Sequence, residues 1–418
     1  MSNLKGEIMK LFHLVLGIVI LVSTACTRDF GTEPGRITVR SLTSNEKKLS
    51  QAGEQFGFEC FETLHRDEPK SNIIISPLSI SMALGMTLNG ADGETAEAMR
   101  STLKFSGLTQ TEINQSYSTL MELLTTTDPK VQFEIANSIW THSTFEVEPT
   151  FIETNKMYFD AQVSALDFRS PSAPDAMNSW VNDKTHGKIS KIVNDIDPHT
   201  IMYLINALYF YGSWQYEFKP SETTDQTFFV SDDKKITTPL MTQTRDRFSY
   251  FENEDVQAID LPYGDGIFTM SILLPRREQT IDGVIKKFGS QWASWSKQFA
   301  FRKGTLLLPK FKLEYQKSLV QALAALGMEV AFSGKADFSR INPNESLFIS
   351  EVLHKTFIDV NEKGTEAAAV TSVAVTLTAV GNQENPFYMR VDRPFLFLIR
   401  EKTSGTILFM GKVINPKE

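Results

Sequence analysis

Apolar residues recur with helical periodicity over the first third of the chain, and runs typical of strands follow. The pattern predicts helices at 49–64, 78–88, 93–103, 175–185 and 318–326. Strands are predicted at 133–140, 202–210, 258–261, 268–274, 305–312, 348–360 and 395–400. Because these elements come in blocks rather than in strict alternation, they indicate an α+β fold with large, mainly antiparallel sheets.

The chain contains no internal repeat, and no linker rich in Pro or Gly occurs after residue 45. We therefore expect one domain over residues 46–418, which is long enough to bury a sizeable core. That domain has a single cysteine, Cys60, among aromatic residues at helical spacing, which indicates a buried inert thiol and no internal disulfide.

The N-terminus predicts export. Residues 11–22 are apolar apart from one histidine, which is too short to span a bilayer and typical of the core of a signal peptide over residues 1–25. Small residues before Cys26 resemble a bacterial lipoprotein signal, in which Cys26 would be acylated. Ser23 and Ala25 also fit ordinary cleavage and secretion. Residues 26–45 are expected to tether the domain to the cell envelope if Cys26 is acylated.

Charge and motifs exclude several classes of protein. The formal net charge of -8 opposes binding to nucleic acid, to a polyanion cofactor, or to membrane except through an N-terminal lipid. The six histidines lack the spacing of a zinc site, so no metal or other cofactor is expected. The chain also lacks GxSxG, GxxxxGK[ST] and GxGxxG motifs, and we expect that it is not an enzyme.

The stretch from Glu362 to Val380 reads EKGTEAAAVTSVAVTLTAV, with no proline and one charge after Lys363. Its alternate positions form one face of small or apolar residues: Thr365, Ala367, Ala369, Thr371, Val373 and Val375. The pattern indicates either a strand or a segment able to become one. Composition alone leaves both a buried core strand and an unusual loop open.

Several motifs make the chain similar to the serpin family over nearly the whole mature length. The most specific is the hinge, formed by Glu362, Lys363, Gly364, Thr365, Glu366, Ala367, Ala368 and Ala369. Supporting blocks follow in family order: NIIISPLSI at 72–80, NALYF at 206–210 with Gly212 and Trp214, LPKF at 308–311, DRPFLF at 392–397 and FMGKV at 409–413.

The resemblance implies a serpin fold with three β-sheets, about nine helices and an exposed reactive-centre loop. A target serine protease would cut the loop, become covalently attached as an acyl-enzyme, and be carried along as the loop inserts into the main sheet. This suicide-type mechanism uses each monomer once and requires a metastable native form.

The resemblance also assigns site residues. Ser76, Ser79, Asn206 and His354 match the polar cluster beneath the main sheet, and Trp214 matches the tryptophan at its opening. The family's usual distance from hinge to reactive bond places that bond between Thr378 and Ala379, with Leu377 as the rival and a shift toward Val380 left open.

The loop composition limits the targets, because no Lys or Arg occurs from residue 365 to residue 389. A trypsin-like pocket would lack its cation, so elastase-, subtilisin- or chymotrypsin-like serine proteases are expected. A papain-like cysteine protease is a lesser option. Two other hypotheses are a noninhibitory serpin that acts as a binding or carrier module, and a structural envelope lipoprotein.

Overall fold

The computed structural model describes residues 39–196, 200–365 and 385–418. Within them the packed domain begins earlier than the predicted boundary at residue 46, because Leu42 is buried and helix α2 starts at Ser44. Thr43 caps this helix in a reciprocal capping box with Glu46, whose carboxylate also pairs with Arg40 at 2.6 Å. The signal peptide and Cys26 lie outside the described residues, and export and lipidation stay predictions.

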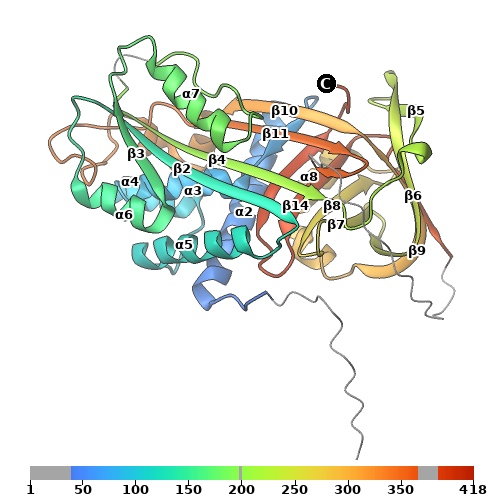
Figure 1. Cartoon of the computed structure of the whole chain (residues 1–418). Coiled ribbons are helices and arrows are strands. Elements are labelled where there is room, and N and C mark those ends of the chain that lie inside the picture. The colour runs from blue at the N-terminus through green and yellow to red at the C-terminus, as the bar shows by residue number, and fades with distance from the viewer. Residues whose placement is uncertain (1–38, 197–199, 366–384) are drawn as a thin grey trace, which may run out of the picture. The chain divides into compact units, whose positions relative to one another are not determined.

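One sheet has six strands in the order β10-β11-β12-β4-β2-β3 (Figure 1). Its strands are β2 (Val131–His142), β3 (Ala161–Leu166), β4 (Met202–Ser213), β10 (Phe311–Ser318), β11 (Leu353–Asn361) and β12 (Gly364–Thr365). The short strand β12 is antiparallel to both β11 and β4, so these two long strands run in the same direction on either side of it.

The second sheet has nine strands, in the order β1-β15-β14-β8-β7-β6-β9-β13 with β5 also paired to β6. Its strands are β1 (Ile73–Ile75), β5 (Thr224–Phe229), β6 (Lys235–Glu252), β7 (Val256–Pro262), β8 (Phe268–Pro275), β9 (Ala300–Pro309), β13 (Phe387–Arg390), β14 (Phe395–Glu401) and β15 (Ile407–Val413). Strand β6 pairs with β5, β9 and β7 along its length, and therefore joins two of the three expected sheets into one hydrogen-bonded sheet.

Eight α-helices lie in the described ranges, and with the two sheets they confirm the predicted α+β class. They are α2 (Ser44–Asp67), α3 (Pro77–Leu88), α4 (Gly93–Thr102), α5 (Gln110–Thr126), α6 (Pro149–Phe159), α7 (Ala173–Lys184), α8 (Ile281–Trp295) and α9 (Val320–Leu323). The sequence analysis did not predict α5, α6 and α8. None of the described helices is long and apolar enough to cross a membrane.

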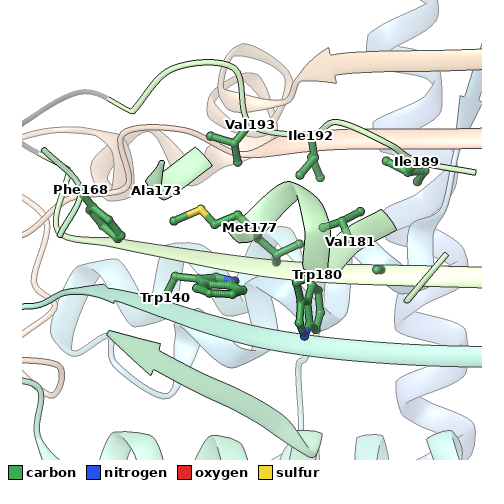
Figure 2. Packing of buried hydrophobic residues seen from close by; sticks show 11 residues of the cluster. Trp140, Phe168, Ala173, Met177, Trp180, Val181, Ile189, Ile192 and Val193 are labelled. Carbon is green, nitrogen blue, oxygen red and sulfur yellow. The ribbon is translucent and has the colours of Figure 1, made fainter. Parts of the chain in front are cut away.

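Helix α7 covers one face of the six-stranded sheet. Figure 2 shows Met177 and Val181 of this helix packed toward the strands, where Trp140 meets Trp180 edge to face with ring centroids 6.3 Å apart. Ile205 of β4 belongs to the same cluster. Because side chains alternate along a strand, the even-numbered residues of β4 point to the other face, which packs on α3.

Three predicted elements differ from the structure. The predicted strand 305–312 breaks at Lys310, because its two halves, β9 and β10, belong to different sheets. The predicted strand 348–360 begins only at Leu353. The predicted helix 318–326 is α-helical only over Val320–Leu323, and a π-helical turn with Gly327 at φ +111° follows it.

Cys60 is fully buried in α2, as its helical spacing among aromatic residues predicts. Burial raises the pKa of its thiol to about 12, so the thiolate is scarce at neutral pH and the group is inert.

Candidate functional site

The chain reverses direction immediately after β11 and returns as β12. Thr365 pairs with Val360 of β11 and with Gly212 of β4, so the beginning of the predicted reactive loop lies between two strands of the sheet. Its side chain is only 3% exposed, and its hydroxyl lies 2.6 Å from the Tyr263 hydroxyl. The side chain of Thr365 therefore faces the core rather than α7.

Gly364 has φ +156° and lies against the backbone of β4. A Cβ atom at this position would come within 2.1 Å of the carbonyl oxygen of Gly212. Only glycine allows so close an approach, and any side chain would push the hinge out of the sheet.

Trp214 holds the turn before the hinge from the end of β4. Its backbone N–H donates to the Lys363 carbonyl at 2.8 Å, and its indole Nε1–H donates to the Asn361 carbonyl at 2.9 Å. The indole also stacks on the ring of Tyr263 with centroids 4.4 Å apart. One aromatic pair thus contacts both the turn and the side chain of Thr365.

Glu362 anchors the turn from the opposite side. Its carboxylate accepts a hydrogen bond from the Thr223 hydroxyl and pairs with the Lys310 ammonium at 2.8 Å. Burial raises the pKa of Glu362, but hydrogen bonds from Lys310, from its own backbone and from Thr223 outweigh that effect and leave the pKa below its ordinary value. The carboxylate is therefore ionised at neutral pH, and in this form it holds the turn through Lys310 and Thr223.

Beyond Thr365, no described strand lies between β4 and β11. These two strands are not paired with each other anywhere in the described residues, although β4 pairs with β2 and β11 pairs with β10 on their outer edges. A small cavity, open to solvent, lies in the gap. It is lined by Leu208 and Phe210 of β4, by Thr356 and Ile358 of β11, and by Thr365 at one end.

The polar cluster predicted from the resemblance lies in the same cavity. Ser76, Ser79, Asn206 and His354 all line it, and Nε2 of His354 accepts the backbone N–H of Ser76 at 3.1 Å. Asn206 donates to Asn137 at 2.7 Å, but its own Oδ1 is buried and has no hydrogen-bond partner among the described residues. Buried polar atoms are nearly always hydrogen-bonded, so this oxygen is an acceptor available to a group that enters the cavity.

His354 makes the intact protein sensitive to acid. Burial lowers the pKa of its imidazole from 6.5 to about 3, so between these values the unfolded chain binds a proton that the folded protein does not. Stability therefore rises with pH across this window and is lost as pH falls below about 6.5, by roughly 1.4 kcal/mol per pH unit. The melting temperature should fall from pH 6.5 to pH 4, and His354→Asn should reduce that fall. The exposed control His186→Asn should show the same fall in melting temperature as the parent chain. If the fall with pH is equally steep in His354→Asn, then His354 is not responsible for it.

The structure brings together the hinge residues Glu362, Gly364 and Thr365 with Trp214, next to the cavity that holds the polar cluster. The other residues predicted from the sequence lie outside the described residues: Cys26, Glu366, Ala367, Ala368, Ala369, Leu377, Thr378 and Ala379. Within the described part of the chain, no group of three His, Cys, Asp or Glu residues could hold a metal ion.

Sequence reasoning did not identify Tyr263, Lys310 or Asn137 as parts of this site. Tyr263 lies just beyond β7, Lys310 lies in the break between β9 and β10, and Asn137 lies on β2. Each contacts its partner across more than fifty positions of sequence, and no local pattern marks such a contact. Only the neighbouring motif LPKF, at 308–311, pointed to Lys310.

Comparison with known proteins agrees with this geometry. The family model for serpins, described as serine protease inhibitors, matches residues 51–416, and the chain belongs to the serpin family. The leukocyte elastase inhibitor of Bos taurus is 35% identical over 382 residues, which cover 88% of this chain and 100% of that relative.

Solved structures show the same fold. The thermophilic serpin tengpin in its native state matches with a TM-score of 0.79 and 32% identity, over 91% of this chain and 96% of that one. Human thyroxine-binding globulin in complex with its hormone matches with a TM-score of 0.81 and 28% identity, over 90% and 100%. The family thus contains inhibitors and at least one thyroxine-binding protein.

Proposed function

We propose that this serpin is a suicide-type protease inhibitor whose reactive loop, once cut, inserts between β4 and β11. The observation that carries the proposal is the position of β12, which already pairs Thr365 between these strands at the end of an open cavity. A segment of small and β-branched residues follows directly in the sequence.

Continuing the register of Thr365 supports the proposal. Each step of two residues along the loop moves two residues back along β4 and β11. Ala367 would then lie opposite Phe210 and Ile358, and Ala369 would lie opposite Leu208 and Thr356. Small side chains thus fall beside large or buried ones, which the core face of a central strand can accommodate.

The same register brings Thr371 opposite Asn206 of β4 and His354 of β11. A threonine hydroxyl is a donor, and Oδ1 of Asn206 is a buried acceptor that has no partner among the described residues. Insertion would therefore offer this acceptor a hydrogen-bond donor.

Insertion would also supply the driving force. Ladder hydrogen bonds contribute about 0.5 to 1.5 kcal/mol each, so some ten inserted residues give on the order of 10 kcal/mol. The uncut loop cannot gain this energy, because the chain is held at Thr365 on one side and in β13 on the other. Cleavage between Thr378 and Ala379, or after the rival Leu377, would release one end.

The proposed targets are elastase-, subtilisin- or chymotrypsin-like serine proteases. The experiment incubates the purified chain with elastase, subtilisin, chymotrypsin, trypsin and papain, followed by a denaturing gel and the mass of the released C-terminal peptide. We expect a covalent complex with at least one of the first three enzymes, and slower or no trapping of trypsin. Faster trapping of trypsin than of elastase would contradict the target class.

A noninhibitory binding or carrier module is the second candidate, and the fold shared with thyroxine-binding globulin favours it. The retained hinge argues against it, because a carrier has no need of small residues that fit a closed sheet. The same gel separates the two functions: a carrier yields cleaved chain without any covalent complex.

A further inference from the structure

An exposed aromatic and cationic surface lies on β6, β9 and β13, the last three strands in the order of the nine-stranded sheet. We call it the Phe301 surface. Its members are Arg247, Phe301, Lys303, Thr305 and Tyr388. Phe301 is 68% exposed and Tyr388 is 59% exposed. Two large aromatic side chains exposed on neighbouring strands are a common feature of interaction surfaces.

Strand geometry places these residues on one face. Phe301, Lys303 and Thr305 occupy alternate positions of β9, and Tyr388 of β13 pairs directly with Thr305. The neighbouring residue Phe387 points to the opposite face, where it is buried and stacks on another aromatic ring of β6. The core packing of β13 therefore holds Tyr388 outward.

The surface carries positive charge on an acidic protein. The Arg247 guanidinium lies over the Phe301 ring, 4.3 Å from its centroid, and pairs with no carboxylate among the described residues. Lys303 is paired with Asp246 at 2.9 Å. Arginine and aromatic side chains are enriched in the residues that dominate binding at protein interfaces. The Arg247 cation also stands out because the whole chain has a net charge of -8.

The surface adjoins the point where the reactive loop rejoins the fold. Arg302 of β9 donates from Nη2 to the carbonyl of Asn385 at 2.9 Å, two residues before β13 begins. Seven residues separate the expected bond after Thr378 from Pro386, and they reach at most about 25 Å when fully extended. A protease domain of about 220 residues has a radius of gyration near 17 Å, so a protease bound at this bond is large enough to reach the sheet end.

We propose that the Phe301 surface is a second docking site for the target protease. The protease would contact this surface with acidic and apolar side chains of its own. These side chains would lie next to the part of the protease's active-site cleft that binds the residues following the cut bond. This inference rests on the proposed function and adds to it a selection of targets by charge, independent of the residue at the cut.

Contacts at this surface should act on encounter rather than on insertion. Complementary charge raises the rate of association and makes that rate sensitive to salt. The fate of the acyl-enzyme depends instead on the gap between β4 and β11, which involves none of these residues. The rate of complex formation and the stoichiometry of inhibition therefore separate the two sites.

The test measures both quantities for Arg247→Glu and Phe301→Ala, with the protease that the parent chain traps fastest, at low and at physiological salt. The matched controls are Lys156→Glu and Met157→Ala on α6, where Met157 is 70% exposed. We expect each test variant to slow complex formation about tenfold, with stoichiometry unchanged and with weaker salt dependence in Arg247→Glu. The control variants should match the parent chain.

Rates within twofold of the parent in both test variants would overturn the docking site while leaving the proposed function intact. Failure of the parent to form a covalent complex with any protease would overturn both. If sedimentation shows a dimer of the parent that Phe301→Ala dissociates, the surface binds a second copy of the chain and the inference is wrong.

Discussion

Replacing Thr365 with arginine is expected to convert the protein from an inhibitor into a substrate. Thr365 is buried between β11 and β4 with its hydroxyl against Tyr263, and it is the first residue that the inserting loop must keep in the sheet. A buried charge without a partner costs several kcal/mol, so insertion should slow relative to hydrolysis of the acyl-enzyme. Because each 1.4 kcal/mol changes a rate about tenfold, the stoichiometry of inhibition should rise at least about tenfold.

The control for this change is Thr126→Arg, at the exposed end of α5, where a cation near a helix C-terminus is tolerated. On a denaturing gel the Thr365→Arg protein should give mainly cleaved chain, and the Thr126→Arg protein should give the parent's amount of complex. An undiminished complex band from Thr365→Arg would mean that the hinge does not enter the sheet core.

Replacing Trp214 with alanine is expected to release the hinge from the end of β4. The change removes the indole hydrogen bond to Asn361 and the stacking on Tyr263, and leaves a cavity beside Thr365. Loss of a buried tryptophan costs about 3–5 kcal/mol, which should lower the melting temperature by roughly 5 °C or more. Hydrogen exchange should also quicken at residues 361–365.

Trp295→Ala provides the matched control, because Trp295 is equally buried but lies at the end of α8, a helix that packs on α2. Both variants should melt earlier than the parent. Only Trp214→Ala should expose the backbone amides of the hinge to exchange, and equal exchange in both variants would show that Trp214 does not hold the turn.

Local sequence patterns predicted α2, α3, α4, α7, β2 and β4 in the first half of the domain, but not α5, α6, β1, β3 or β5. Helix α3 ends at Leu88 as its periodicity predicts, and β4 begins at Met202. The buried face of such an element can be predicted from the spacing of apolar residues within one short segment.

Sequence patterns did not predict where strands change sheet. The run around Lys310 looks like one strand, but the chain passes from the nine-stranded to the six-stranded sheet at this residue. The merging of two sheets through β6 depends in the same way on partners far along the chain. Pairing between strands far apart in the chain cannot be inferred from the residues of one short segment, so these features are found only in the three-dimensional structure.

The hinge motif of the candidate site could be predicted from the sequence, but the residues that contact the hinge could not. The residues from Glu362 to Thr365 carry the resemblance to the family, and the face of small residues follows from their alternation. The contacts that hold them come from Tyr263, Trp214 and Lys310. The orphan oxygen of Asn206 is likewise a property of packing that no composition reveals.

The most direct test of the account compares the melting temperatures of the intact chain and the same chain cut once in the loop after Gly364. Calorimetry on both forms, with the cut verified by mass, reports whether cleavage releases a strained state. We expect the cut form to melt roughly 10 °C higher or more, because insertion adds on the order of 10 kcal/mol of sheet pairing. Identical melting temperatures for the two forms would contradict the insertion mechanism.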